Sequence, residues 1–134
     1  MSSFIANGTT LRMSFKCGDE VKTTTSQYKV ARLTASMTVS IATAVTDNVV
    51  GIIESMQSAG SEVCSVITHG VARGIMQTAT SCAIGVWLVA NPTGTLETAI
   101  TNTTAQIVVG RALTVPATGG AVVVYVTPIP TFLV

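Results

Sequence analysis

The sequence predicts an all-β protein, and three observations support that fold class. The β-branched residues Val, Ile and Thr supply 51 of the 134 residues (19, 10 and 22), and their stiff side chains suit a pleated, half-buried surface. Gly and Pro punctuate the chain, and no segment carries a long apolar stripe at helical spacing. A strand–loop–strand unit also occurs twice. We therefore expect a single-domain β-sandwich or barrel of about nine short strands.

The repeated unit relates residues 49–68 to residues 108–127 through a constant offset of 59. Each copy reads as a strand, a roughly eight-residue connection ending in Gly, and a second strand of alternating apolar residues. The matched residues include Val49 with Val108, Val50 with Val109, Gly51 with Gly110, Ser55 with Thr114, Gly60 with Gly119, Val63 with Val122 and Ile67 with Val126. A shared register over this length indicates one β-unit used twice, an internal two-fold repeat.

Individual strands are predicted where alternating or continuous apolar runs are bounded by turn residues. The expected strands start at Val21 and then cover residues 28–35, 39–45, 49–56, 62–68, 71–76, 84–90, 96–100, 107–113 and 122–127. A bend is expected at His69-Gly70, between two of these strands. The run 84–90 is nearly continuously apolar, so we expect it to be central and covered on both faces. Asn91-Pro92-Thr93-Gly94 is the clearest turn and makes residues 96–100 the hairpin partner of that run.

The expected β-domain covers residues 17–127 and is flanked by two apolar ends. Residues 1–16 read either as a first strand or as an arm that reaches a neighbour, in which case residues 1–15 are dispensable for folding. Residues 128–134 contain prolines where a ladder donor would be missing, so we expect a docked tail there and not a central strand. The apolar residues of these two ends that we expect at an interface are Phe4, Ile5, Leu11, Phe15, Ile129, Phe132, Leu133 and Val134.

Low charge distinguishes this composition from that of an ordinary soluble domain. Only 10% of the residues are charged and the net charge is +1, against about a quarter charged in a typical domain, so repulsion does little to keep copies apart. The longest apolar run, residues 83–90, is too short for a membrane-spanning helix, and no signal peptide is recognisable at the N-terminus. Near-neutral charge and 4% aromatic residues also argue against nucleic-acid binding. Assembly with other protein is therefore expected.

Residues able to carry chemistry are few. The three cysteines lack Cys-x-x-Cys spacing, which favours free thiols in a reducing compartment. Cys64 and His69 are the one nucleophile–base pair, and they should point to opposite faces of a strand. A single His leaves no second imidazole for a metal, and the acids lie mostly in or beside turns. We therefore expect no enzymatic activity, no metal and no cofactor. Trp87 is expected in the core, with an interface anchor or a sugar platform as the alternatives.

Arg73 and Arg111 are the two charges placed inside strongly apolar strand sequence. They can occupy a solvent-facing side of their strands. They can also form ion pairs across a subunit or shell contact, where the planar guanidinium is favoured. Both are therefore candidate interface residues.

Several short motifs follow one another in a fixed order across residues 17–127. They are Val49-Val50-Gly51-Ile52, Ala59-Gly60-Ser61-Glu62-Val63, His69-Gly70-Val71, Ala83-Ile84-Gly85-Val86-Trp87, Asn91-Pro92-Thr93-Gly94, Val109-Gly110-Arg111-Ala112-Leu113 and Val122-Val123-Val124. In this order they resemble the small capsid decoration, or cement, proteins of tailed bacteriophages. The chain departs from that family at Val86, where Asp often follows the Gly, and the two ends are not covered by the resemblance.

The resemblance implies a non-enzymatic structural protein of the virion, made in the host cytoplasm and added to the outer surface of an icosahedral capsid. Its partners would be the major capsid protein, whose neighbouring capsomers it clamps, and further copies of itself, often as trimers. Such a clamp uses many weak contacts repeated by symmetry. The β-domain would form the oligomer, and the two ends would reach the shell or the adjacent protomer. The alternative is a β-sandwich module of a phage fibre or cell surface that binds a glycan or receptor through Trp87.

Overall fold

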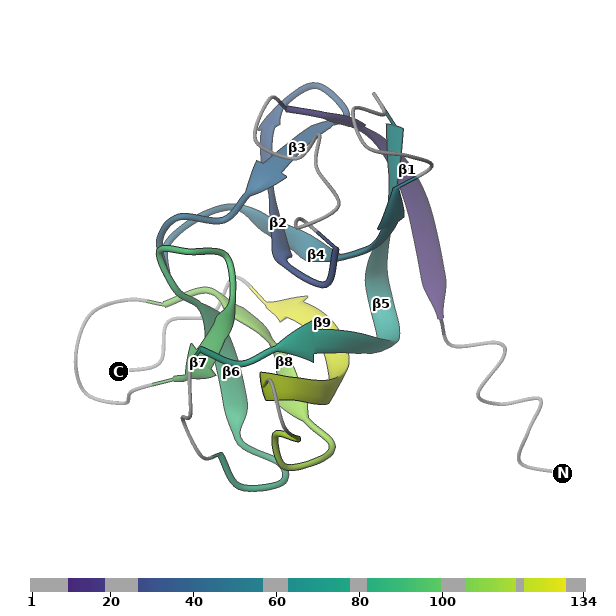
Figure 1. Cartoon of the computed structure of the whole chain (residues 1–134). Helices are drawn as coiled ribbons and strands as arrows, with labels where there is room; N and C mark the ends of the chain where they lie inside the picture. The colour runs from purple at the N-terminus through teal and green to yellow at the C-terminus, as the bar shows by residue number, and fades with distance from the viewer. Residues whose placement is uncertain are drawn as a thin grey trace, which may run out of the picture.

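The computed structural model describes residues 10–18, 27–56, 63–77, 82–99, 106–117 and 120–129. These residues form nine β-strands, and the all-β prediction is confirmed (Figure 1). The strands are β1 (Leu11–Cys17), β2 (Val30–Ala35), β3 (Thr38–Ile41), β4 (Val49–Met56), β5 (Val63–Ile75), β6 (Trp87–Ala90), β7 (Leu96–Thr98), β8 (Val108–Ala112) and β9 (Ala121–Ile129).

The first five strands close into a small barrel, which we call the first unit. Its strand order is β1-β3-β2-β4-β5, and antiparallel pairing of β1 with β5 completes the ring, which is seen nearly end-on at the top of Figure 1. Closure leaves no exposed sheet edge around the ring. Alternate side chains point inward and fill the barrel, namely Phe15, Cys17, Ala31, Val39, Ile53, Cys64 and Val66.

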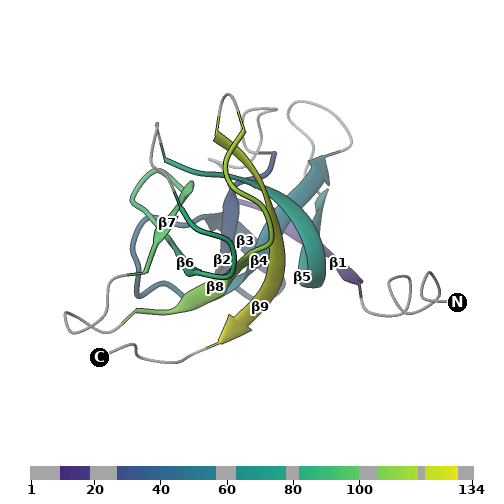
Figure 2. The same cartoon turned by 90° about the horizontal axis from the view of Figure 1, so that it is seen from below.

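The second unit begins where β5 leaves the first. β5 bends at Gly70, which has a positive φ of 111°, and from there to Ile75 it pairs with β9. Figures 1 and 2 show β5 passing from the ring into the lower half of the molecule, where it lies beside β9. The order continues as β9-β8-β6-β7, and a parallel bridge between Met76 and Leu96 joins β7 back to the end of β5. The second unit is therefore built from five strand segments, like the first.

Backbone hydrogen bonds show that the two units are copies of one arrangement. The amide of Tyr28 donates to Ile53 O, as the amide of Gly85 donates to Ala112 O. The same correspondence relates the bond from Ala42 to Val30 to the bond from Ala99 to Trp87, and the bond from Gly18 to Val39 to the bond from Gln77 to Leu96. The five strand segments of the first unit thus have equivalents in the second. In order, β1, β2, β3, β4 and the first part of β5 correspond to the second part of β5, β6, β7, β8 and β9. The predicted repeat therefore extends to all five strands. Its predicted register is wrong by one residue in the second strand, because Phe15 pairs with Cys64 while the equivalent Gly74 pairs with Val122, so Val122 corresponds to Cys64 and not to Val63.

Positive-φ positions repeat in the same way. Tyr28 (φ 70°) corresponds to Gly85 (φ 88°), and Met37 (φ 49°) corresponds to Gly94 (φ 83°). Both pairs are separated by 57 residues, whereas the β4 and β8 positions are separated by 59. The offset is thus 57 for β2 and β3 but 59 for β4, so matching at a constant offset of 59 does not detect the correspondence of β2 and β3 with β6 and β7.

The strand predicted at residues 39–45 ends earlier than expected. β3 ends at Ile41 because the Asp47 carboxylate accepts hydrogen bonds from the amides of Thr43 and Ala44, at 2.7 and 2.9 Å. Such a side-chain acceptor stabilises a turn in place of a ladder, so the alternating residues 43–45 belong to that turn. The strand expected from Val21 lies outside the described residues.

The prediction for residues 84–90 was wrong in part. Only Trp87–Ala90 form a strand, because Gly85 takes a left-handed conformation just before it. Ile84 is 69% exposed, and the ring of Trp87 is half-buried on the outer side of β6. The run is therefore not covered on both faces, although the hairpin to β7 through residues 91–94 is confirmed.

Of the two alternatives for residues 1–16, the described part of that segment fits the first strand, and β9 extends past residue 127. Residues 11–16 belong to β1, so Phe15 lies inside the first barrel at 5% exposure and is not available to a partner. At the other end β9 continues through Pro128 to Ile129, which pairs with Val108. Pro128 lies beyond the last pairing with β5, at Val126, and proline is tolerated where one side of a strand is an edge.

Close backbone approach at equivalent glycines leads to a stability prediction. A Cβ on Gly51 would lie 2.0 Å from Ile67 O, and one on Gly110 would lie 2.2 Å from Tyr125 O. At Gly74 the nearest atom is the end of the Leu96 side chain, at 2.6 Å. We expect Gly51→Ala and Gly110→Ala each to lower the free energy of unfolding by about 2–3 kcal/mol, because backbone must move.

Urea denaturation measures these losses, with Gly74→Ala as the matched control. That control should lose about 1 kcal/mol or less, because a side-chain end moves more easily than a carbonyl. Equal losses in all three variants would contradict the close-approach explanation.

Candidate interaction surface

The two arginines predicted at an interface are both exposed on the outer side of the second unit. The Arg73 guanidinium lies over the Tyr28 ring, with Cζ 5.2 Å from its centroid. The Arg111 guanidinium lies over Trp87 at 5.0 Å, and its Nε donates to Gly85 O at 3.1 Å. Within the described ranges, no carboxylate lies at ion-pair distance from either guanidinium. Each cation is thus held in place by an aromatic ring and leaves its charge available to a partner.

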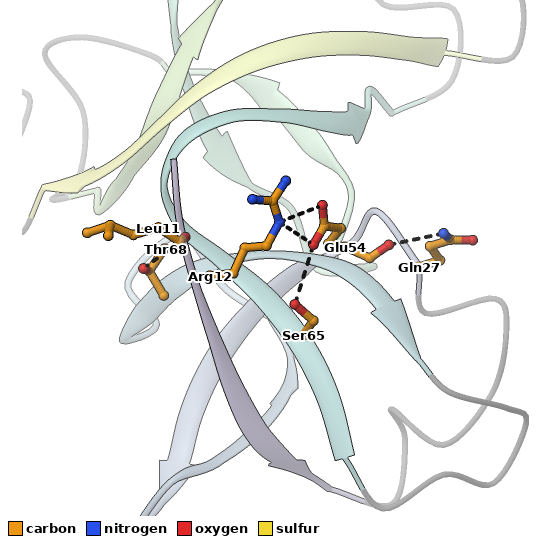
Figure 3. Close-up of polar contacts among 6 residues, drawn as sticks. All are labelled: Leu11, Arg12, Gln27, Glu54, Ser65 and Thr68. Carbon is orange, nitrogen blue, oxygen red and sulfur yellow. Dashed lines mark hydrogen bonds and ion pairs between the residues drawn. The ribbon is translucent and has the colours of Figure 1, made fainter. Parts of the chain in front are cut away.

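A polar cluster covers the corresponding outer side of the first unit (Figure 3). Arg12 Nε donates to both carboxylate oxygens of Glu54, at 2.8 and 3.0 Å, and Ser65 Oγ donates to Glu54 Oε1 at 3.4 Å. Gln27 Nε2 donates to the backbone oxygen of Glu54 at 3.0 Å. The hydrogen bond and charge of Glu54 raise the pKa of the Arg12 guanidinium above its ordinary value. This surface is polar and satisfied within the chain.

The second unit carries apolar residues at the three equivalent positions, which we call the apolar trio. Val71 replaces Arg12, Leu113 replaces Glu54 and Val123 replaces Ser65, as the equivalent strand registers show. Their exposures are 47%, 42% and 36%.

The three residues of the trio are neighbours on one face. Val123 is opposite Arg73 on β5, two residues from Val71, and the Leu113 amide donates to Val123 O at 2.8 Å. A contiguous exposed apolar patch beside a charge available for pairing marks an interaction surface.

A groove of about 530 Å³ opens beside Arg73. Its lining comes from both units and includes Tyr28, Glu54, Val71, Arg73 and Val123. Tyr28 has a left-handed φ of 70°, which is unfavourable for a bulky residue by about 1–2 kcal/mol. The bond from its amide to Ile53 O, at 2.7 Å, holds this conformation, and the ring is thereby placed under the Arg73 guanidinium. Such local strain is found where a side chain must be positioned for contact.

The nucleophile–base pair considered from the sequence is separated in space. Cys64 lies inside the first barrel, where burial, followed by the hydrogen bond with Cys17, raises the pKa of its thiol to about 12. His69 instead contacts Tyr125 edge-on, with ring centroids 5.5 Å apart. Among the described residues, no group of His, Cys, Asp and Glu side chains could hold a metal ion. The part of the chain that is described also contains no helix long and apolar enough to cross a membrane.

The other predicted interface residues have mixed positions. Leu11 is 58% exposed on β1, and Ile129 lies in β9. Phe4, Ile5, Phe132, Leu133 and Val134 lie outside the described residues. Sequence analysis missed the apolar trio. Aligning the two repeat copies and comparing their residues would have shown that Leu113 takes the place of Glu54.

Comparison with known proteins adds no family assignment. No family model matches the chain, and no curated protein is detectably similar to it in sequence.

The raised pKa of Cys64 predicts a loss of stability at alkaline pH. The native thiol ionises near pH 12, whereas the thiol of an unfolded chain ionises near 8.5. The unfolded state therefore releases this proton first, and the free energy of unfolding falls as the pH rises between these two values. Urea denaturation from pH 8 to 10.5 should show a steeper loss for the natural chain than for Cys64→Ala. Identical slopes for the two proteins would contradict the buried-thiol explanation.

Proposed function

We propose that the protein is a structural component of a bacteriophage virion that binds the outside of an icosahedral capsid and bridges neighbouring capsomers of the major capsid protein. The observation that carries the proposal is the apolar trio beside Arg73. The order of motifs along residues 49–124 resembles that of capsid decoration proteins, and the composition suits a chain that spends its life assembled with other protein.

The contrast between the two units supports a docking role for the second. Where the first unit pairs Arg12 with Glu54 on its surface, the second presents Val71 and Leu113 to solvent. Burying an exposed valine or leucine against a partner contributes about 1 kcal/mol for a half-covered side chain. Three such contacts per copy are weak alone but strong when symmetry repeats them over a shell.

Arg73 restricts the kind of partner surface that fits this contact. Its guanidinium is oriented by Tyr28 and lies on the same strand as Val71, so a partner with a carboxylate beside an apolar patch fits this face. A net charge of +1 gives little long-range attraction, so short-range fit decides binding. We therefore place the shell contact on the β5–β9 side of the second unit, next to the groove.

The shell contact is tested most sharply by giving the outer face of the second unit the charged residues of the equivalent face of the first unit. The double variant Val71→Arg/Leu113→Glu places at these positions the ion pair that Arg12 and Glu54 already form. It should fold normally, because the equivalent surface of the first unit carries the same residues. Binding to expanded, undecorated shells of the phage that encodes the protein should weaken at least tenfold in cosedimentation, because apolar contact is replaced by hydrated charge.

The control for that test is Asn48→Glu, which adds a charge to an exposed turn of the first unit. It should bind shells at the same saturating ratio as the natural chain. Unchanged binding of the double variant would overturn the placement of the contact. A natural chain that fails to bind such shells, yet binds a glycan, would replace the capsid proposal with the receptor-binding alternative.

The N-terminal segment allows a separate prediction. Removing residues 1–9 leaves β1 complete, whereas removing residues 1–15 deletes most of the strand that closes the first barrel. We expect the shorter truncation to unfold cooperatively at nearly the natural midpoint and to bind shells more weakly. The longer truncation should lose the cooperative transition seen by circular dichroism. Full shell occupancy by the shorter truncation would contradict a role for residues 1–9 in binding.

A further inference from the structure

The contact between the two units uses different surfaces on each side. On the first unit, Val30 and Ile52 are paired across β2 and β4, point away from the barrel interior, and are fully buried in the larger core cluster. On the second unit they meet the β6–β7 turn and β5. The Val30 amide donates to Gly94 O at 2.8 Å, and Ile52 Cδ1 lies 3.6 Å from the Cβ position of Gly74. We call these two sides the donor face and the acceptor end.

Each unit carries an equivalent of both surfaces, because the units are copies. The second unit's donor face is the pair Trp87 and Arg111, which are opposite each other across β6 and β8 as Val30 and Ile52 are across β2 and β4. Unlike Val30 and Ile52, this pair is not fully buried: Arg111 is exposed and stacks on Trp87, which is half-buried. Ile84, 69% exposed, lies just before it.

The first unit's acceptor end is also open. Met37, the equivalent of Gly94, is 48% exposed, whereas Phe15, the equivalent of Gly74, is buried at 5%. Met13, two residues before Phe15 on β1 and equivalent to Ala72, is 45% exposed. Leu11 is exposed two residues before Met13 on β1, and Leu33 is exposed four residues before Met37, on β2. At the covered end the equivalent residues are small or buried, which allows close approach of the first unit. At the open end they are large and apolar, so they project from the barrel and leave a surface to be covered.

We propose that a second copy of this chain docks its Trp87–Arg111 donor face on the Met13–Met37 acceptor end of the first. In this contact, two chains are joined in the same way as the two units within one chain. Methionine adapts its shape to a partner and packs favourably against an aromatic ring such as Trp87. Because the two surfaces differ, the contact is head-to-tail, and it closes into a ring or extends according to its rotation. The proposal needs no capsid, since it concerns the protein alone.

Two variants with opposite defects test this contact. Arg111→Glu removes the cation from the donor face and leaves the acceptor end intact. Met13→Glu/Met37→Asp makes the acceptor end polar and leaves the donor face intact, and Asp tolerates the left-handed conformation at position 37 better than Met. Ile84→Glu serves as a second donor-face variant should Arg111→Glu unfold. Circular dichroism and urea midpoints check that each variant folds.

Sedimentation velocity across about 1–200 μM, the range where weak contacts form, then gives distinct outcomes. The natural chain should form assemblies of two or more copies, and each variant alone should remain a monomer. A 1:1 mixture of the two variants should form a two-chain complex and nothing larger, because only one intact junction remains. A monomeric natural chain, an acceptor-end variant that assembles like the natural chain, or a mixture that stays monomeric would each overturn the proposal. Shell binding is measured separately, so failure here is distinguishable from failure of the capsid proposal.

Discussion

The structure depends on a single strand that belongs to both units. β5 pairs with β1 and β4 before Gly70 and with β9 after it, so the bend at that glycine fixes how the second unit follows the first. Hydrogen-bonded pairing on both sides of the bend resists motion between the units. The groove beside Arg73, the buried pair Val30–Ile52 and the apolar trio all owe their positions to this shared strand.

Duplication gives the chain two surfaces of the same shape with different chemistry. Where the first unit satisfies its outer charges internally through Arg12 and Glu54, the second exposes Val71, Leu113 and Val123. The reverse holds at the contact between units, where Val30 and Ile52 are covered and their equivalents Trp87 and Arg111 are open. A copied barrel thus keeps its backbone hydrogen bonds while its side chains diverge, and the divergence marks the surfaces available to partners.

Much of the fold could be predicted from local signals. The β-branched composition, the Asn91–Gly94 turn and the match of Val49-Val50-Gly51 with Val108-Val109-Gly110 indicated the class, one hairpin and the repeat. The pairing of β1 with β5 that closes the barrel could not be predicted from the sequence, because it joins residues about fifty positions apart that share no pattern. The register between copies also slips by one, since Phe15 pairs with Cys64 but Gly74 pairs with Val122. Matching at a fixed offset therefore hides that Val123 replaces Ser65.

We propose that the second unit's outer face meets the shell while the first unit's equivalent face does not. Hydroxyl-radical footprinting of the protein, free and on saturated shells, measures this directly by side-chain oxidation. We expect strong protection of Val71, Leu113 and Val123 on shells, with unchanged labelling of the Arg12 and Ser14 side chains. Equal oxidation of the three apolar residues in free and shell-bound protein would contradict it.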